Sequence, residues 1–418
     1  MSTLTAAPPI ARLRALPLRC HHCGHEHEAG PSAVCELCLG PLEPIYGVRT
    51  LPDHATIASR PRTIWRYHEW LPFEGAPLYS LDTGFTPLIE SEALARRLNV
   101  ARVWIKNDSV SHPSLSFKDR VVASAINAAA AFNLDTIGCA STGNLANAVA
   151  AHAARAGLTA WIFIPDSLEP AKIAMTAIYG PKLVRVRGTY DDVNRLCTQV
   201  ADRFGWGLVN VNLRTYYGEG SKTMAFEIAE QLSWRTPTAV VAPMAGGALV
   251  TRLHKGFREF REAGLLTGTA PRLYGAQAEG CAPIVRLVER GGATLEPAIP
   301  NTIARSLAIG NPADGLLAAA AIRESGGWAA AVTDAELVQG IRLLAETSGV
   351  FTETAGGVTV AAALRLAAEG HLRPHDEVVL CITGNGLKTT DALGTALQPS
   401  PVIDARIREV AALVERDA

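Results

Sequence analysis

Between about residue 100 and residue 382, short runs of β-forming residues alternate with longer Ala-rich amphipathic stretches, and this alternation limits the fold more than any other feature. Strands are expected at 103–105, 136–139, 160–164, 183–186, 239–242, 273–276 and 378–382. Helical periodicity occupies the intervening stretches 120–131, 144–156, 190–204 and 219–232. Such alternation predicts an α/β protein with parallel sheets covered on both faces. Ligands of such proteins bind where strands end and helices begin.

Composition sets the size and the general class of the protein. At roughly 150 residues per domain, 418 residues predict two or three domains. Apolar residues make up 48% of the chain and charged residues 19%, which excludes a disordered chain. The net charge of −1 gives no electrostatic case for binding nucleic acid or an anionic membrane. Because no long apolar run and no secretory signal is found, we expect a cytoplasmic protein without a membrane partner.

The eight cysteines fall into two groups. Four of them form a C-x2-C-x11-C-x2-C pattern: Cys20, Cys23, Cys35 and Cys38. In a reducing cytosol, paired thiolates at this spacing predict a closed, structural Zn²⁺ site. A ribbon without metal and a redox pair remain alternatives, and nearby histidines could compete as ligands: His21, His22, His25 and His27. The other cysteines lie in apolar surroundings and are expected to be small buried residues: Cys139, Cys197, Cys281 and Cys381.

Two polar segments open predicted helices. Lys118, in Ser-Phe-Lys-Asp-Arg, lies at a helix start, where the helix dipole favours a neutral amine that can form a Schiff base. On its own, such a lysine is more often a solvated surface charge. The segment 141–144, Ser-Thr-Gly-Asn, directly follows a strand and could cradle an anion with its hydroxyls and free N–H groups. Ordinary helix capping is the alternative.

Two further segments follow predicted strands. Residues 243–249, Pro-Met-Ala-Gly-Gly-Ala-Leu, make a turn of small residues into a helix, as phosphate-binding loops do. Residues 383–388, Thr-Gly-Asn-Gly-Leu-Lys, follow a buried strand. Each segment taken alone is compatible with an ordinary strand–helix turn.

Taken in order, these four segments, together with Gly-Phe-Thr-Pro-Leu at 84–88 and the segment 219–232, resemble the threonine synthases. These are pyridoxal-phosphate (PLP) enzymes of the tryptophan-synthase-β structural family. The resemblance covers about residues 80–395, and a cysteine ribbon also occurs in some members. It implies two α/β domains of the fold type II kind, with PLP in the cleft between them. We expect a zinc-ribbon-like segment at 1–48, an arm at 49–90, a catalytic body of two interleaved domains at 91–398 and a tail at 399–418.

The resemblance also implies residue roles. Lys118 would hold PLP covalently and move protons, Asn144 would bind the ring hydroxyl, and Thr383 would face the pyridine nitrogen. Backbone N–H groups of one loop would cradle the cofactor phosphate: Ala245, Gly246, Gly247, Ala248 and Leu249. Four residues would hold the substrate's carboxylate or phosphate: Lys106, Ser141, Thr142 and Lys172. For both lysines a surface charge is the alternative.

The implied reaction converts O-phospho-L-homoserine and water into L-threonine and inorganic phosphate by γ-elimination and β-addition. The implied partner is therefore a small phosphorylated amino acid, and a homodimer is the default for a soluble enzyme of this size. The loop Ala-Gly-Gly-Ala-Leu and the segment before Lys118 depart from the commoner family pattern. Three alternatives stay open: a cysteate synthase-like enzyme acting on O-phosphoserine, a threonine or serine dehydratase, and a non-catalytic zinc-ribbon interaction protein. The intact Lys118, Asn144 and Thr383 argue against the last.

Overall fold

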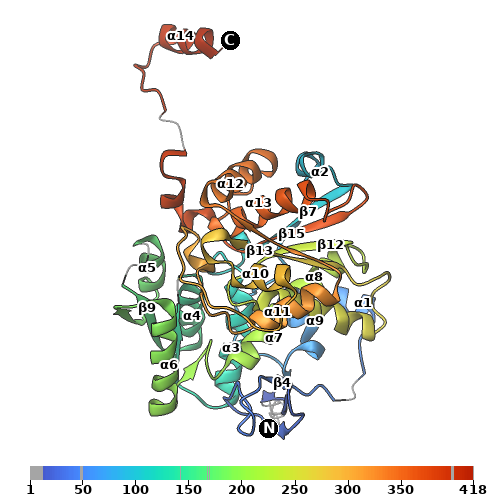
Figure 1. Cartoon of the computed structure of the whole chain (residues 1–418). Helices are drawn as coiled ribbons and strands as arrows, with labels where there is room; N and C mark the ends of the chain where they lie inside the picture. Colours follow the sequence, from blue (N-terminus) through green and yellow to red (C-terminus); the bar gives the residue numbers. More distant parts are fainter. Residues whose placement is uncertain are drawn as a thin grey trace, which may run out of the picture.

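The larger of two mainly parallel sheets lies in the upper right of the body in Figure 1. The computed structural model describes residues 13–47, 50–141, 143–166, 168, 170–396 and 400–417. The strand order of the larger sheet is β14-β13-β12-β15-β7-β6, and only the edge strand β6 runs antiparallel to its neighbour. The strands are β6 (Leu88–Glu90), β7 (Arg102–Asn107), β12 (Ala239–Pro243), β13 (Arg272–Ala278), β14 (Ala329–Val332) and β15 (Glu377–Ile382).

Helices cover both faces of this sheet. In β12, the consecutive residues Val240 and Val241 are both fully buried, and they belong to hydrophobic clusters on opposite faces. A strand buried on both sides explains the continuous apolar runs in the sequence. One face packs against α2 (Glu92–Leu98), α12 (Asp334–Ser348) and α13 (Thr354–Ala368). The other packs against α8 (Thr223–Gln231), α9 (Ala248–Glu262), α10 (Pro283–Arg290) and α11 (Gly315–Glu324).

The smaller sheet is entirely parallel and has the order β10-β9-β8-β11. Its strands are β8 (Thr136–Ala140), β9 (Thr159–Pro165), β10 (Lys182–Val186) and β11 (Gly207–Leu208). The helices beside it are α4 (Asn144–Ala156), α5 (Pro170–Ala177) and α6 (Tyr190–Phe204), seen together on the left of Figure 1. The prediction of two parallel-sheet α/β domains is therefore confirmed, and every strand predicted from the sequence is present.

Two further helices pack against each other. The Ala-rich α3 (Lys118–Ala131) packs closely against α7 (Arg214–Ser221). A Cβ atom on Gly220 would lie 2.4 Å from the carbonyl oxygen of Arg120, so only glycine allows this approach. The single helix predicted at 219–232 is instead divided at Lys222 into α7 and α8.

The N-terminal segment forms a small antiparallel sheet of β2 (Leu18–Cys20), β3 (Glu26–His27) and β4 (Leu42–Pro44). The expected arm contains α1 (His54–Ser59), the 3-10 helix η1 (Ile64–Trp70) and β5 (Phe73–Glu74), which pairs with β1 (Arg14–Ala15). Other 3-10 turns are η2 (Asp108–Val110), η3 (Glu279–Cys281), η4 (Arg305–Leu307), η5 (Gly386–Lys388) and η6 (Thr390–Ala396). The C-terminal α14 (Ile407–Asp417) stands apart from the body in Figure 1. Among the described residues, no helix has the length and apolar character needed to cross a membrane.

Candidate cofactor and substrate site

A pocket lies where the predicted segments of the two sheets meet. Its wall includes the start of α3, the loop between β8 and α4, the loop between β12 and α9, and Thr383 after β15. These are carboxyl ends of parallel strands and N-termini of helices, as the topology requires for a ligand site. The structure therefore brings together the predicted cofactor residues: Lys118, Asn144, Ala245, Gly246, Gly247, Ala248, Leu249 and Thr383.

Lys118 is the first residue of α3, and its amine reaches into the pocket. The Lys118 Nζ atom donates a hydrogen bond of 2.6 Å to the hydroxyl oxygen of Tyr217. The preceding residue, Phe117, donates its N–H to the carbonyl oxygen of Thr383 at 2.8 Å. This bond ties the start of α3 to the end of β15, so that Lys118 and Thr383 occupy the same wall of the pocket.

Asn144, at the start of α4, is held by a carboxylate that sequence reasoning missed. Its Nδ2 atom donates a 2.6 Å hydrogen bond to Oε1 of Glu353, which is 1% exposed. The Asn144 Oδ1 and Glu353 Oε2 atoms are buried and have no hydrogen-bond partner in the structure. Because buried acceptors are normally satisfied, these two atoms fit a ligand that brings its own donors.

The loop before α9 has the form of an anion cradle. Gly247 has a φ of 91°, and a Cβ there would lie 2.8 Å from the carbonyl oxygen of Asp314. The helix begins at Ala248 without a side-chain cap, so its first N–H groups are available to an anion. An amine, a phosphate cradle, a hydroxyl and unpaired acceptors in one pocket fit PLP.

The predicted substrate residues differ in whether they line the pocket. Ser141 lines the pocket, and its hydroxyl oxygen accepts N–H bonds of 2.9 Å from both Gly143 and Ala146. Thr142 lies outside the described residues. Lys172 is buried in α5 beneath this loop, where a Cβ on Gly143 would lie 2.2 Å from its Cδ atom. Lys172 is not among the described residues that line the pocket.

Lys106 belongs to a buried ion-pair network and not to the pocket wall. Its Nζ atom donates to Glu227 Oε2 at 2.7 Å, to the carbonyl oxygen of Thr86 at 2.6 Å and to Gln231 Oε1 at 2.9 Å. Burial lowers the pKa of the Lys106 amine, and the Glu227 carboxylate opposes that shift. The expectation that Lys106 faces the substrate phosphate is therefore corrected: its amine bonds Thr86, Glu227 and Gln231, and Lys106 is not among the described residues that line the pocket.

Among the described residues that line the pocket, the cation besides Lys118 is Arg214, at the start of α7. Its Nη2 atom lies 2.5 Å from Oδ1 of Asp314, whose backbone packs against Gly247. Sequence reasoning missed Arg214 because the segment Asn-Leu-Arg-Thr-Tyr-Tyr matched no motif that we had considered. The signal that could have found it is its position directly before the recognised segment at 219–232.

The thiols of Cys20, Cys23, Cys35 and Cys38 gather at one point, all within 4.8 Å of one another. The Cys20–Cys38 and Cys23–Cys35 Sγ distances are 3.4 and 3.7 Å, and all four thiols are free. Four convergent sulfurs fit a tetrahedral Zn²⁺ ion. Of the competing histidines, His25 and His27 gather separately with Glu36. The remaining cysteines are buried, as expected: Cys139, Cys197, Cys281 and Cys381.

Comparison with known proteins agrees with this site. The family model "Pyridoxal-phosphate dependent enzyme" matches residues 79–384, so the chain is a PLP-dependent enzyme. Threonine synthase of Methanosarcina acetivorans is 33% identical over 93% of this chain and 96% of its own length. Threonine synthase of Methanocaldococcus jannaschii is 34% identical over 90% of this chain and 93% of its own. Within the PLP-dependent lyases, the chain belongs to the threonine synthase family.

Solved structures show the same fold at lower identity. Maize serine racemase has a TM-score of 0.61 at 19% identity, and the match covers 80% of this chain and 94% of the racemase. A threonine deaminase from Solanum lycopersicum has a TM-score of 0.61 at 21% identity, and the match covers 75% of this chain and 89% of the deaminase. These likenesses establish the fold type and carry no argument about the reaction.

Proposed function

We propose that this protein converts O-phospho-L-homoserine and water into L-threonine and inorganic phosphate. The observation that carries the proposal is that, in this member of the threonine synthase family, the Lys118 amine and the Arg214 guanidinium line one pocket. The Lys118 amine can react at the carbon next to an amino group, and the Arg214 guanidinium can bind a phosphate. The homodimer, the cytoplasmic location and the lack of a nucleic-acid partner remain predictions.

Three residues of the chain would serve the cofactor. PLP, when bound, supplies an electron sink that allows C–H bonds beside an amino group to break. Lys118 is the base that takes the substrate's α-proton and later returns it. Asn144, fixed by Glu353, orients the ring through its unpaired oxygen. Thr383 would face the pyridine nitrogen with a neutral hydroxyl, which would make the cofactor a weaker electron sink than an aspartate at this position would.

Arg214 would receive the substrate's phosphate. A guanidinium binds phosphate with two parallel N–H donors, and a phosphate dianion can compete with the single carboxylate of Asp314. The same contact stabilises the charge that develops on the leaving phosphate. Ser141 lines the wall at the start of the α4 loop and remains a candidate for the substrate carboxylate.

The test measures threonine and phosphate released from O-phospho-L-homoserine by the PLP-loaded protein. Arg214→Met should raise KM and lower kcat, with a loss of kcat/KM on the order of 10²-fold, as for one lost preorganised donor. Arg290→Met is the matched control, because Arg290 forms an exposed ion pair with Glu296. Equal effects of the two substitutions would remove Arg214 from the phosphate site.

A further inference from the structure

Helix α7 contacts β4 of the N-terminal cysteine ribbon, and its label lies just above that of β4 in Figure 1; the same helix contributes Arg214 and Tyr217 to the pocket. One side of the helix is bonded to the ribbon. Thr215 Oγ1 donates to the carbonyl oxygen of Leu42 at 3.2 Å, and the Tyr216 hydroxyl donates to that of Gly30 at 3.1 Å. Both residues share one helix face with Glu219, because Thr215 lies four residues and Tyr216 three residues before it.

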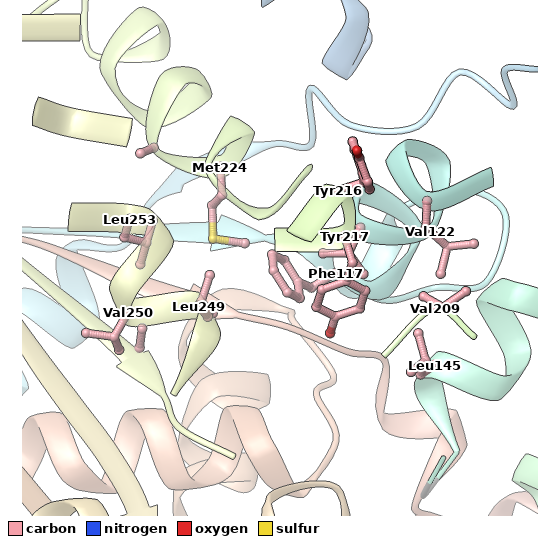
Figure 2. Close-up of a cluster of buried hydrophobic side chains, with 14 of the residues drawn as sticks. Phe117, Val122, Leu145, Val209, Tyr216, Tyr217, Met224, Leu249, Val250 and Leu253 are labelled. Atoms are coloured by element: carbon pink, nitrogen blue, oxygen red, sulfur yellow. The ribbon is translucent and has the colours of Figure 1, made fainter. Parts of the chain in front are cut away.

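The other side of α7 faces the pocket. Arg214 and Tyr217 are three residues apart, share that side and both line the pocket. Figure 2 shows the rings of Tyr216 and Tyr217 pointing to opposite sides. The Tyr217 hydroxyl oxygen lies 2.6 Å from Lys118 Nζ. A helix of eight residues therefore contacts the ribbon on one side and the reactive amine on the other.

Glu219 of α7 lies in a buried, charged network that also contains Arg252 and Lys255 of α9 and reaches Tyr46 and Glu43 of the ribbon. Glu219 is completely buried, and it accepts hydrogen bonds from Tyr46 at 2.5 Å, Arg252 at 2.8 Å and Lys255 at 2.9 Å. Burial alone would raise the pKa of Glu219, but neighbouring Lys222, Lys255 and Arg252 lower it well below its ordinary value. An ionised Glu219 must keep these partners, since leaving a buried charge unpaired is costly. Tyr46 thus connects the ribbon directly to Glu219, and Glu43 connects it through Arg252.

We propose that Tyr217 is a further catalytic residue and that the cysteine ribbon sets its position through α7. When Lys118 takes a proton from the substrate, the resulting ammonium donates a hydrogen bond to the Tyr217 oxygen. The proton stays on Nζ, and the bond holds it over the pocket until it returns to substrate carbon. The role of Lys118 as the base rests on the proposed function, whereas the contact itself does not depend on which phosphorylated amino acid enters.

The first experiment measures exchange of the α-proton of L-threonine, and separately of O-phospho-L-serine, in D2O by NMR. Tyr217→Phe should keep the cofactor's visible absorbance and slow exchange by about 10²-fold, the scale of losing one preorganised hydrogen-bonding partner. Tyr274→Phe is the matched control, because the hydroxyl of this buried tyrosine donates to the carbonyl oxygen of His371 and accepts from Arg272, and Tyr274 is not among the described residues that line the pocket. Exchange in Tyr217→Phe equal to that in Tyr274→Phe would overturn the proposal.

The second experiment tests the ribbon. Tyr46→Phe should change the visible circular dichroism of the bound cofactor and slow exchange, because α7 loses one of its ribbon bonds. In a Tyr217→Phe background, the same substitution should slow exchange little further, since coupled residues are not additive. If Tyr46→Phe and Tyr217→Phe slow exchange by fully additive amounts, the ribbon does not set the position of Tyr217. If O-phospho-L-homoserine yields no threonine while Tyr217→Phe still loses exchange, the proposed function fails and the role of Tyr217 stands.

Discussion

Lys106 Nζ lies 2.7 Å from the Glu227 carboxylate, and neither side chain is exposed to solvent. Arg120 completes the network by bonding both Glu227 and Asp108, at 2.8 Å from Glu227 Oε2 and 2.6 Å from Asp108 Oδ2. The Phe85 N–H donates to Glu227 at 2.7 Å, so the Gly-Phe-Thr-Pro-Leu segment is anchored to α8. The recognised segments at 84–88 and 219–232 are thus partners in one buried network, which stabilises the body behind the pocket.

Lys106→Met should therefore reduce stability and leave substrate binding intact. Removing one partner of a buried ion pair costs about 3–5 kcal/mol, and without Lys106 the carboxylates of Glu227 and Asp108 would share the single cation Arg120. Denaturant unfolding gives the free energy of unfolding, and kinetics below the melting temperature give KM. The exposed Lys182→Met is the control. A raised KM with unchanged stability would return Lys106 to the substrate site.

Acid should weaken the fold through Glu227. Burial would raise the pKa of this carboxyl, but the charges of Arg120 and Lys106 lower it from 4.5 to about 2. A folded-state pKa below the unfolded value contributes stability above pH 4.5 that is lost as pH falls toward 2. The linkage gives a loss of about 2 kcal/mol between about pH 5 and about pH 3. Urea unfolding should show this loss in the wild type but not in Glu227→Gln; parallel declines would contradict the assignment.

Lys118→Ala should abolish turnover and the visible absorbance band of the lysine-bound cofactor, with the fold retained. The reason is that Lys118 is the only lysine among the described residues that line the pocket. Borohydride reduction followed by peptide mass analysis should find the cofactor on Lys118 in the wild type. Labelling of another lysine, or turnover by Lys118→Ala at the wild-type rate, would show that the anchor is elsewhere. Lys182→Ala serves again as the control.

The cysteine ribbon should hold about one Zn²⁺ per chain, because four thiolates complete a tetrahedral site. Metal analysis of protein purified without chelator measures it directly. Cys20→Ser should lower the zinc content and loosen residues 15–45, whereas the buried Cys281→Ser should not. From the spacing alone, chelation would spare the cofactor chemistry. The bonds from the ribbon to α7 now predict that chelation also changes the cofactor's circular dichroism.

The sequence predicted the strands of the sheets and the residues expected to bind the cofactor, because both depend on local patterns. Continuous apolar runs such as the one in β12 mark strands buried on two faces, and Lys118 and Asn144 lie at helix starts that short motifs reveal. The short strand β14, Ala329–Val332, was missed because its Ala-rich sequence, Ala-Ala-Ala-Val, lacks the β-branched residues that mark strands.

Long-range pairing explains the parts of the site that the sequence did not predict. Lys106 and Glu227 are 121 positions apart, and nothing local to Lys106 shows that its charge is already paired. Glu353 reaches Asn144 from 209 positions away, and Arg214 pairs with Asp314 from a distant part of the sequence. A basic residue near a site motif could therefore be recognised, but its partner could not.

Product analysis with O-phospho-L-homoserine tests the central claim most directly. The account predicts L-threonine and inorganic phosphate in equal amounts, with unphosphorylated homoserine a very poor substrate. Rapid conversion of free threonine to 2-oxobutyrate, with phosphohomoserine inert, would contradict it in favour of a dehydratase. Cysteate from O-phosphoserine and sulfite, with no threonine from phosphohomoserine, would contradict the reaction while leaving the phosphate site in place.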